Sequence, residues 1–374
     1  MGCVLLPLIS LLVQAAPALP GEIIVNGQRP EALATCAERP CSTQEDVRRS
    51  IGHAEALFAR GKYSEARAVL SDALSRQRHN ARAFPRLVAA LYEASATVNL
   101  HLGDMGRYRT AIIAQGRTLR ENLPEDDPQV LLTKVELGEF WLKQRQSSEA
   151  RRQFESAAQS YARRGEARLS ALCHLRVVAL DIGLGSFSAA EKRLEIIARS
   201  PAAADPSVRL VSAVMVARLA AGRGRDVDVD ALVATLRAEP SATPVLVRSG
   251  KLPFEAEEPA PIVLGEQMPD TGRTSPQWAD VGFMIGHDGR VSDVEVLRGS
   301  RHASWVEPYI AEIADRRYVS PNLPAGQPGI YRIERYSLRA ARSVPKGSLI
   351  KQPVGRAYVV VTDLTAHYAA SQKK

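Results

Sequence analysis

A short phrase of glycine, any residue, an aromatic residue, two further residues and alanine recurs in this 374-residue chain, and it constrains the fold more than any other feature. The phrase occurs at 61–66, 106–111 and 185–190, and a reduced copy lies at 147–150. The alanines that end the four copies stand 45, 39 and 40 residues apart. A nearly constant period of this size is typical of stacked supersecondary units.

Each copy has the spacing of one helix face. Counted from the aromatic position, small or apolar residues stand at offsets 0, 3, 7 and 10; in the first copy these are Tyr63, Ala66, Leu70 and Ala73. The copies that begin at Ser147 and Phe187 follow the same pattern, whereas the second copy places Gln115 and Thr118 at the later offsets. The pattern predicts amphipathic helices, with the second copy frayed or shifted in register.

Another helical run precedes each phrase, so the repeating unit is a pair of helices. The glycine is suited to the turn between them because it adopts a left-handed conformation at little cost. A fifth, weaker pair is expected at 208–220 and 229–238. The pairs across 46–239 resemble the tetratricopeptide (TPR) repeat, with a longer period than usual; the alternative is a plain helical bundle. The resemblance implies a concave surface that holds a peptide or a partner domain.

The stretch from 278 to 321 has the order strand, turn, strand, helix, strand. Val281, Phe283 and Ile285 alternate with less apolar neighbours, a turn follows at 287–290, and a second alternating run predicts a hairpin. The next segment has apolar residues at helical spacing, and these are Val306, Tyr309, Ile310 and Ile313. A last short run at 317–321 ends in a proline.

These elements resemble the C-terminal domain of the TonB family. Its members carry a Val-x-Phe-x-Ile hairpin, an Asp-Gly-x-Val turn, a serine after the second strand, and an Arg-aromatic-x-x-Pro motif after the helix. In this chain the matching residues are 281–285, 288–291, Ser300, and Arg317, Tyr318 and Pro321. The resemblance covers residues 278–340 and implies a small ββαβ domain in the periplasm, which accepts an extended segment of an outer-membrane receptor along an exposed strand.

In this resemblance the accepting edge is the last strand, at 331–338. The candidate partner-binding residues are Tyr331, Ile333, Arg335 and Tyr336. Backbone hydrogen bonds supply the affinity of such pairing, and alternate side chains supply its preference. The apolar run within 356–362 is an alternative partner that closes the same edge.

The expected fold class is mainly α with a small α+β domain: a TPR-like array of α-hairpins followed by a TonB C-terminal-like ββαβ domain. Between them, residues 240–277 are rich in proline and are predicted to be a stiff linker that holds the two halves apart without fixing their angle. Residues 341–374 form a tail with one extra strand.

The N-terminal segment 1–20 has an apolar centre and a small-x-small pattern at 16–18, which predicts a signal peptide, or a short anchor if it is not cleaved. Residues 21–45 are expected to be extended. Within them Cys36 and Cys41 are close enough to form a disulfide in an oxidising compartment. A metal site is the alternative, but no second pair completes four ligands.

The formal charge of +8 comes from scattered arginines, which predicts solvated helix faces and no nucleic-acid partner, because no basic run or base-stacking motif accompanies them. Asp226, Asp228 and Asp230 alternate as in a calcium loop, but Arg237 stands where a glutamate is needed. The histidines are dispersed, and no nucleophile signature is present. We therefore assign no catalytic, metal or cofactor-binding residue and expect no enzyme.

Taken together, the patterns predict an exported, non-catalytic interaction protein of the Gram-negative envelope, located in the periplasm, with protein or peptide partners. An outer-membrane receptor is among the partners that the TonB resemblance implies. A β-like phrase at 22–27 resembles the receptor segment that TonB domains recognise. Two alternatives are a TonB-type energy transducer for outer-membrane transport, attached to the inner membrane through its N-terminus, and an envelope enzyme with a site in the concave helical face.

Overall fold

The computed structural model describes residues 41–144, 146–236, 244–249, 277–300, 303–319, 323, 326–343 and 352–365. The predicted signal segment, the β-like phrase at 22–27, Cys36 and most of the predicted linker lie outside these residues. The helices are α2 (Thr43–Ala59), α3 (Tyr63–Gln77), α4 (Pro85–His101), α5 (Met105–Asn122), α6 (Pro128–Lys143), α7 (Ser147–Arg163), α8 (Ala167–Gly183), α9 (Phe187–Ala198), α10 (Pro206–Gly222), α11 (Val229–Thr235) and α12 (Glu307–Ala314). Single 3-10 turns are η2 (Arg78–Asn80), η3 (Pro201–Ala204) and η4 (Ala303–Val306).

The predicted helix pairs are confirmed, from α2 and α3 to α10 and α11. In the first, third and fourth copies the second helix begins at the aromatic position of the phrase or its equivalent, and in the first and fourth a glycine with positive φ, Gly61 or Gly185, stands in the turn before it. In the second copy that glycine is Gly103, three residues before the phrase, and α5 begins earlier. The helix is shifted rather than frayed, because it continues without a break to Asn122.

Arginines join the helices of the array, and several of them are paired rather than simply solvated. The ion pairs between helices include Arg76–Asp46, Arg86–Asp127, Arg151–Asp181, Arg176–Glu139, Arg193–Glu155 and Arg223–Glu191. In most of these ion pairs at least one side chain reaches solvent, so each pair contributes little to the stability of the fold. Arg176 is the exception, because it is buried between α6 and α8, where leaving it unpaired would be costly.

The C-terminal part contains a four-stranded antiparallel sheet in the order β3-β2-β5-β6. Its strands are β2 (Gln277–Gly286), β3 (Val291–Gly299), β5 (Gly329–Ser343) and β6 (Gln352–Asp363). The predicted hairpin is β2 and β3, and the predicted helix is α12. A separate two-stranded sheet pairs β1 (Val245–Arg248) with β4 (Arg317–Val319), so the strand expected after the helix lies outside the larger sheet.

The two faces of the larger sheet pack against different parts of the chain. Val281, Phe283 and Ile285 share a buried cluster with Val306 and Ile313 beside α12. The alternate residues of β2 point to the other face, where Trp278 and the β5 residue Ile333 pack with α2, α3 and α4. The sheet is therefore covered by its own helix on one side and by the first helix pair on the other.

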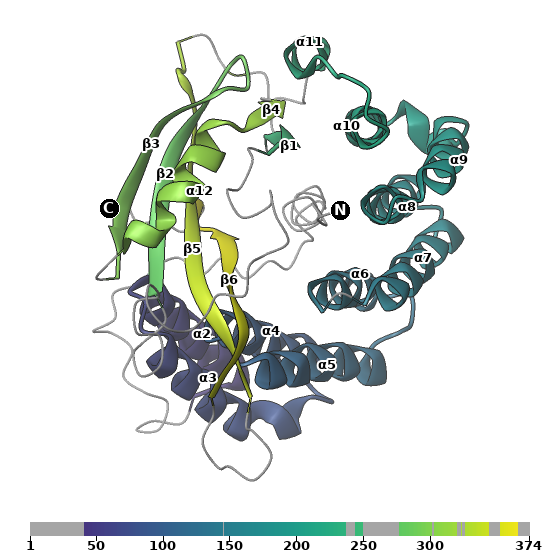
Figure 1. The fold of residues 1–374 in the computed structure, drawn as a ribbon. Helices are drawn as coiled ribbons and strands as arrows, with labels where there is room; N and C mark the ends of the chain where they lie inside the picture. The colour runs from purple at the N-terminus through teal and green to yellow at the C-terminus, as the bar shows by residue number, and fades with distance from the viewer. Residues whose placement is uncertain are drawn as a thin grey trace.

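The sheet closes the arc that the helix pairs form (Figure 1). At one end Ile333 and Leu364 are buried in the cluster of α2 to α4, and at the other end Val247 of β1 and Val319 of β4 are buried with Val233 of α11. The prediction that a linker holds the two halves apart is wrong, because they share buried apolar clusters. Part of that predicted linker is the strand β1.

Candidate functional site

The predicted accepting edge at 331–338 is not an edge. It belongs to β5, which pairs with β2 on one side and with β6 on the other, from Glu334 opposite Asp363 onward. Because both faces of the sheet are covered as well, Ile333, Arg335 and Tyr336 are buried, at 3%, 0% and 1% exposure. The prediction is wrong because the tail of the chain supplies the next strand, the alternative that the apolar run at 356–362 left open.

Tyr331, the fourth candidate residue, is 37% exposed and precedes the part of β5 that β6 covers. Its hydroxyl donates a hydrogen bond to Glu295 of β3 at 3.2 Å, and its ring lies over Gly282. A Cβ at position 282 would collide with this ring, so the glycine makes room for it. The structure therefore leaves Tyr331 on the sheet surface, whereas the other three candidates are buried.

The strand next to β5, β6, takes the place of the predicted edge. Its orientation follows from one hydrogen bond, because the Leu364 N–H donates to the Ile333 carbonyl at 2.8 Å just beyond the strand end. Backbone groups of successive residues alternate in direction, and the pairing of 357–363 with β5 has an unbroken register. The N–H and C=O groups of Val359 and Val361 therefore point away from β5. Within the described residues, β5 is the only strand paired with β6.

This outer side of β6 faces the interior of the arc, opposite the inner helices α6, α8 and α10 (Figure 1). On the α12 face of the sheet, Val361 is 45% exposed, and Val359 packs on the cluster that contains Tyr309 and Tyr336. On the other face, the Thr362 hydroxyl contacts His101 at 2.8 Å. An extended segment beside β6 would therefore meet an apolar face on one side and a polar one on the other.

Two carboxyl groups on α6 have strongly raised pKa values. Burial and the nearby negative charge of Glu93 raise the pKa of Glu136 to about 8, although Gln115 donates to its carboxylate at 2.9 Å. Burial raises the pKa of Glu139 to about 7, against the opposing effect of Arg176, which donates to it at 3.1 Å. Both groups therefore change charge near neutral pH.

Shifted carboxyl groups are also found in enzyme active sites, so their neighbours decide the interpretation. The groups that act on Glu136 and Glu139 are another acid, an amide and cations. In the described part of the chain, no serine, cysteine or histidine side chain forms a hydrogen bond with either carboxylate. Among the described residues, neither carboxylate therefore belongs to a hydrogen-bonded pair of nucleophile and base as used in covalent catalysis.

A serine and a histidine do meet elsewhere, at the contact between the array and the sheet. The Ser337 Oγ lies 2.8 Å from Nδ1 of His101, and the Tyr63 hydroxyl is 3.4 Å from the same oxygen. Ser337 and His101 are both completely buried, at 0% exposure. A substrate cannot reach a nucleophile in this position, so the pair joins β5 to α4.

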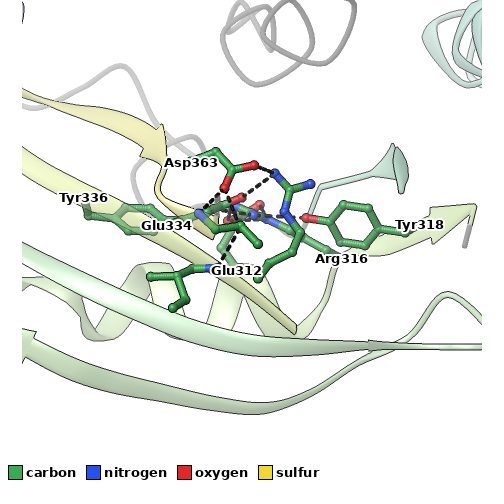
Figure 2. A network of polar contacts seen from close by, with 9 residues as sticks. Glu312, Arg316, Tyr318, Glu334, Tyr336 and Asp363 are labelled. Atoms are coloured by element: carbon green, nitrogen blue, oxygen red, sulfur yellow. Dashed lines mark hydrogen bonds and ion pairs between the residues drawn. The ribbon is translucent and has the colours of Figure 1, made fainter. Parts of the chain in front are cut away.

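A second polar network fills the α12 face of the sheet (Figure 2). Arg316 is at its centre and donates to Glu312 at 2.7 Å, to Glu334 at 2.9 Å and to the Tyr336 hydroxyl at 2.8 Å. The positive charge of Arg316 contributes to a lowered pKa of Glu334, against the opposing effect of burial. All of these side chains are buried, so the network fixes α12 against β5 and offers no open binding position.

Cys41 is disulfide-bonded, whereas Cys173 is a free, buried thiol. Burial raises the pKa of Cys173 to about 11, as expected for an unreactive core cysteine. Cys36, the predicted partner of Cys41, lies outside the described residues. Within the ranges that the structure covers, no three His, Cys, Asp or Glu side chains are placed to hold a metal ion, and no helix is long and apolar enough to cross a membrane.

Sequence reasoning assigned no role to Asp280 and gave Arg335 a different one, in partner binding, whereas both residues hold the array to the sheet. Asp280 and Arg335 form a buried ion pair at 2.6 Å, and Arg335 also donates to backbone carbonyls at the end of α2. One signal was present: Arg332, Glu334 and Arg335 place three charges within four residues of a strand, between Ile330 and Tyr336. Charges in a paired, interior strand require partners on both faces, which the network of Arg316 and the end of α2 provide.

No protein-family model matches the chain, and no curated protein matches it. Similar solved structures include a protein with nearly identical TPR-like repeats of the kinesin light chain type from Podosopora anserina, 16% identical over 52% of this chain and 94% of the other, with a TM-score of 0.43. A variant form of that protein is 17% identical over 52% and 95%, also with a TM-score of 0.43. BtubC (BKLC) from P. vanneervenii is 17% identical over 52% and 79%, with a TM-score of 0.42.

The two P. anserina structures are described as having TPR-like repeats, and this chain contains TPR-like helix pairs of its own. At such low similarity they give no partner and no activity for it. The class that the fold defines is a TPR-like helix-pair protein with a C-terminal sheet that closes its arc.

Proposed function

We propose that this protein is a non-catalytic interaction scaffold that binds an extended segment of a partner protein along β6, inside the arc of helix pairs. The observation that carries the proposal is the position of β6: among the described residues it is the last strand of the sheet, its outer side faces the inner helices, and the backbone groups of Val359 and Val361 point away from β5. Pairing along an open strand gives affinity through main-chain hydrogen bonds.

The proposal retains strand pairing, which the TonB resemblance implies, and moves it from β5 to β6. The exposed side chain of Val361 favours β-branched or aromatic residues at alternate positions of the partner. The half-buried carboxylates Glu136 and Glu139 on α6 favour a basic residue in the same partner, because a cation stabilises their ionised forms. The proposal includes an outer-membrane receptor as the partner protein.

The disulfide at Cys41 supports an exported protein, because disulfides persist in oxidising compartments such as the periplasm. Export is therefore part of the proposal, and N-terminal sequencing of the protein recovered from the periplasm tests it. A start near residue 19 is expected. An intact N-terminus in the inner-membrane fraction would instead favour the transducer with an uncleaved anchor.

The binding edge is tested with a photo-crosslinking residue at Val361 in the full chain, expressed in a Gram-negative host and irradiated in the envelope extract. We expect a crosslinked product in which mass spectrometry locates the link within a single extended segment of another protein. The matched control carries the same residue at Ile196, which is 68% exposed on α9. Equal products from the two positions would mean that β6 has no special role.

A synthetic peptide of the linked segment then allows a sharper test. Val361→Pro removes an outward N–H but no bond to β5, whereas Val361→Thr keeps the N–H and the β-branched shape. The loss of a backbone hydrogen bond and the added ring should weaken peptide binding at least tenfold, or about 1.4 kcal/mol, in the proline variant alone. Unchanged affinity of this variant in fluorescence anisotropy would contradict strand addition at β6.

A further inference from the structure

His101, the last residue of α4, lies at the contact between the array and the sheet and has 0% exposure. Its two ring nitrogens contact two different strands: Nδ1 is 2.8 Å from the Ser337 hydroxyl of β5, and Nε2 is 2.8 Å from the Thr362 hydroxyl of β6. The rings of Phe58 and Tyr63 pack on the imidazole, with centroids 4.7 and 5.8 Å away. One side chain of α4 therefore contacts two strands and two further helices, α2 and α3.

The neutral imidazole suits this position. One of its nitrogens donates and the other accepts, and each hydroxyl is able to take the complementary role. The charged groups that act on the ring are Arg335 and Arg339 of β5 and Lys143 of α6, and all three are cations. The other polar groups that face it, Ser337, Thr362 and the Tyr63 hydroxyl beside them, are uncharged.

Burial and these cations hold the pKa of His101 well below its usual range. The Asp280 carboxylate is engaged by Arg335 and Arg298, on the sheet side of the contact. A proton on His101 would thus add another positive charge to a buried contact that holds no carboxylate for it among the groups named above. The least costly response is separation of β5 and β6 from α4, which lets water reach the ring.

We propose that His101 is an acid-sensitive latch, whose protonation releases the sheet from the first helix pairs and opens the arc. The latch goes beyond the proposed function, because it regulates access to the interior of the arc whether or not β6 binds a partner there. Opening at this end leaves the other contact, of β1 and β4 with α10 and α11, in place. The sheet would then swing about that second contact.

The direction of the pH effect follows from proton linkage. The separated form binds a proton near pH 6.5, and the closed form binds it only at much lower pH, so the closed form is favoured fully above about pH 6.5 and loses its advantage as the pH falls. One proton gives about a tenfold change of the opening equilibrium per pH unit in this range. The opening equilibrium stops changing when the pH falls below the pKa of His101 in the closed form.

The test uses hydrogen exchange of the full chain at about pH 7, 6 and 5, corrected for intrinsic rates. In the wild type we expect the opening equilibrium of peptides from β5 and the end of α4 to rise about tenfold per pH unit below about pH 6.5. His101→Gln keeps a donor and an acceptor but does not titrate, so this rise should be absent. His79→Gln, at an exposed histidine, is the matched control and should behave like the wild type.

Peptides of α8, whose Leu175 and Val178 are completely buried within the array, serve as the internal reference. Parallel acceleration of α8 and β5 would mean global unfolding and would overturn the latch, as would an unchanged pH slope in His101→Gln. A second variant, Thr362→Val, removes the hydroxyl at Nε2 but keeps the titrating ring. It should raise opening at every pH and retain the slope; loss of its slope would equally overturn the proposal.

Discussion

Arg335 brings a positive charge into the contact between the first helix pair and the sheet. It binds the Asp280 carboxylate through two nitrogens, at 2.6 and 2.8 Å, and donates to the carbonyls of Phe58 and Ala59 at the end of α2. Carbonyls at a helix C-terminus attract cations. The guanidinium also lies 4.1 Å from the centre of a Trp278 ring. A single residue thus caps a helix, neutralises a buried acid and stacks on an aromatic ring.

Arg335→Ala should therefore destabilise the protein by about 3–5 kcal/mol, because Asp280 would keep a buried charge with a weaker partner. Urea unfolding measures this change. Arg298→Ala is the matched control, since Arg298 contacts the same carboxylate at 2.8 Å from a side chain that is 40% exposed. The control should lose less than about 1 kcal/mol. Equal losses would show that Asp280 does not depend on Arg335.

Glu136 gives a pH prediction of the opposite sign to that of His101. Its pKa in the folded chain is about 8, above the ordinary value of 4.5, so the folded state holds more protons between these values and its stability falls as the pH rises through that window. Glu136→Gln should flatten this decline and make the protein more stable at about pH 8 than the wild type. Urea midpoints at several pH values measure it, with exposed Glu121→Gln on α5 as the control. Identical profiles for the wild type and Glu136→Gln would contradict the assignment.

The helix pairs were predictable element by element because each needs only local spacing. The faces of Tyr63, Ala66 and Leu70 are buried as the offsets predict. The second copy was harder, since Gln115 looks like a solvent-facing residue, whereas it is 4% exposed and hydrogen-bonded to Glu136 from the next helix pair. Sequence spacing shows which face is buried but not which partner a buried polar group meets.

The sheet was predictable as far as its local hairpin. The edge of β5 is able to pair with a segment of a partner or with the apolar run at 356–362 of the same chain. The local sequence of β5 is the same in both cases, so it does not predict the observed pairing with β6. The charges of Arg332, Glu334 and Arg335 favour the closed form. Each of these side chains forms an ion pair in the folded chain, whereas an open edge that accepts a ligand strand does not require buried ion pairs.

Helices α6 and α7 approach each other closely at Gly138. A Cβ at Gly138 would overlap the ring of Phe154, which is completely buried. Gly138→Ala should cost about 1–3 kcal/mol through overpacking, less the helix propensity gained by alanine. Gly106→Ala in α5 is the control, because the nearest atom to its added Cβ is 3.7 Å away. Thermal unfolding should show a loss for the first and little change for the second; equal effects would mean that α6 and α7 are further apart.

Closure of the arc appears only at the scale of the whole molecule. The contacts that produce it join residues far apart in the chain, such as Tyr63 with Ser337, separated by 274 positions, and Arg335 with Ala59, separated by 276. No local pattern contains such pairings. The proline-rich composition of 240–277 favoured two independent halves. Apolar residues at one end of the array are instead buried with β5 and Leu364, and those at the other end are buried with β1 and β4.

Shared clusters predict that the array and the sheet unfold together near neutral pH. Leu364, just after β6, is 8% exposed and packs with α2, α3 and α4, so Leu364→Ala should cost about 2–4 kcal/mol. Because the cluster belongs to both halves, hydrogen exchange in urea should show α3 and β5 losing protection at the same, lowered denaturant concentration. Ile196→Ala on the exposed side of α9 should shift neither. In a contradicting result, β5 would lose protection in Leu364→Ala while α3 kept its wild-type midpoint. The sheet would then unfold separately from the array, and closure of the arc would add nothing to the stability of the helix pairs.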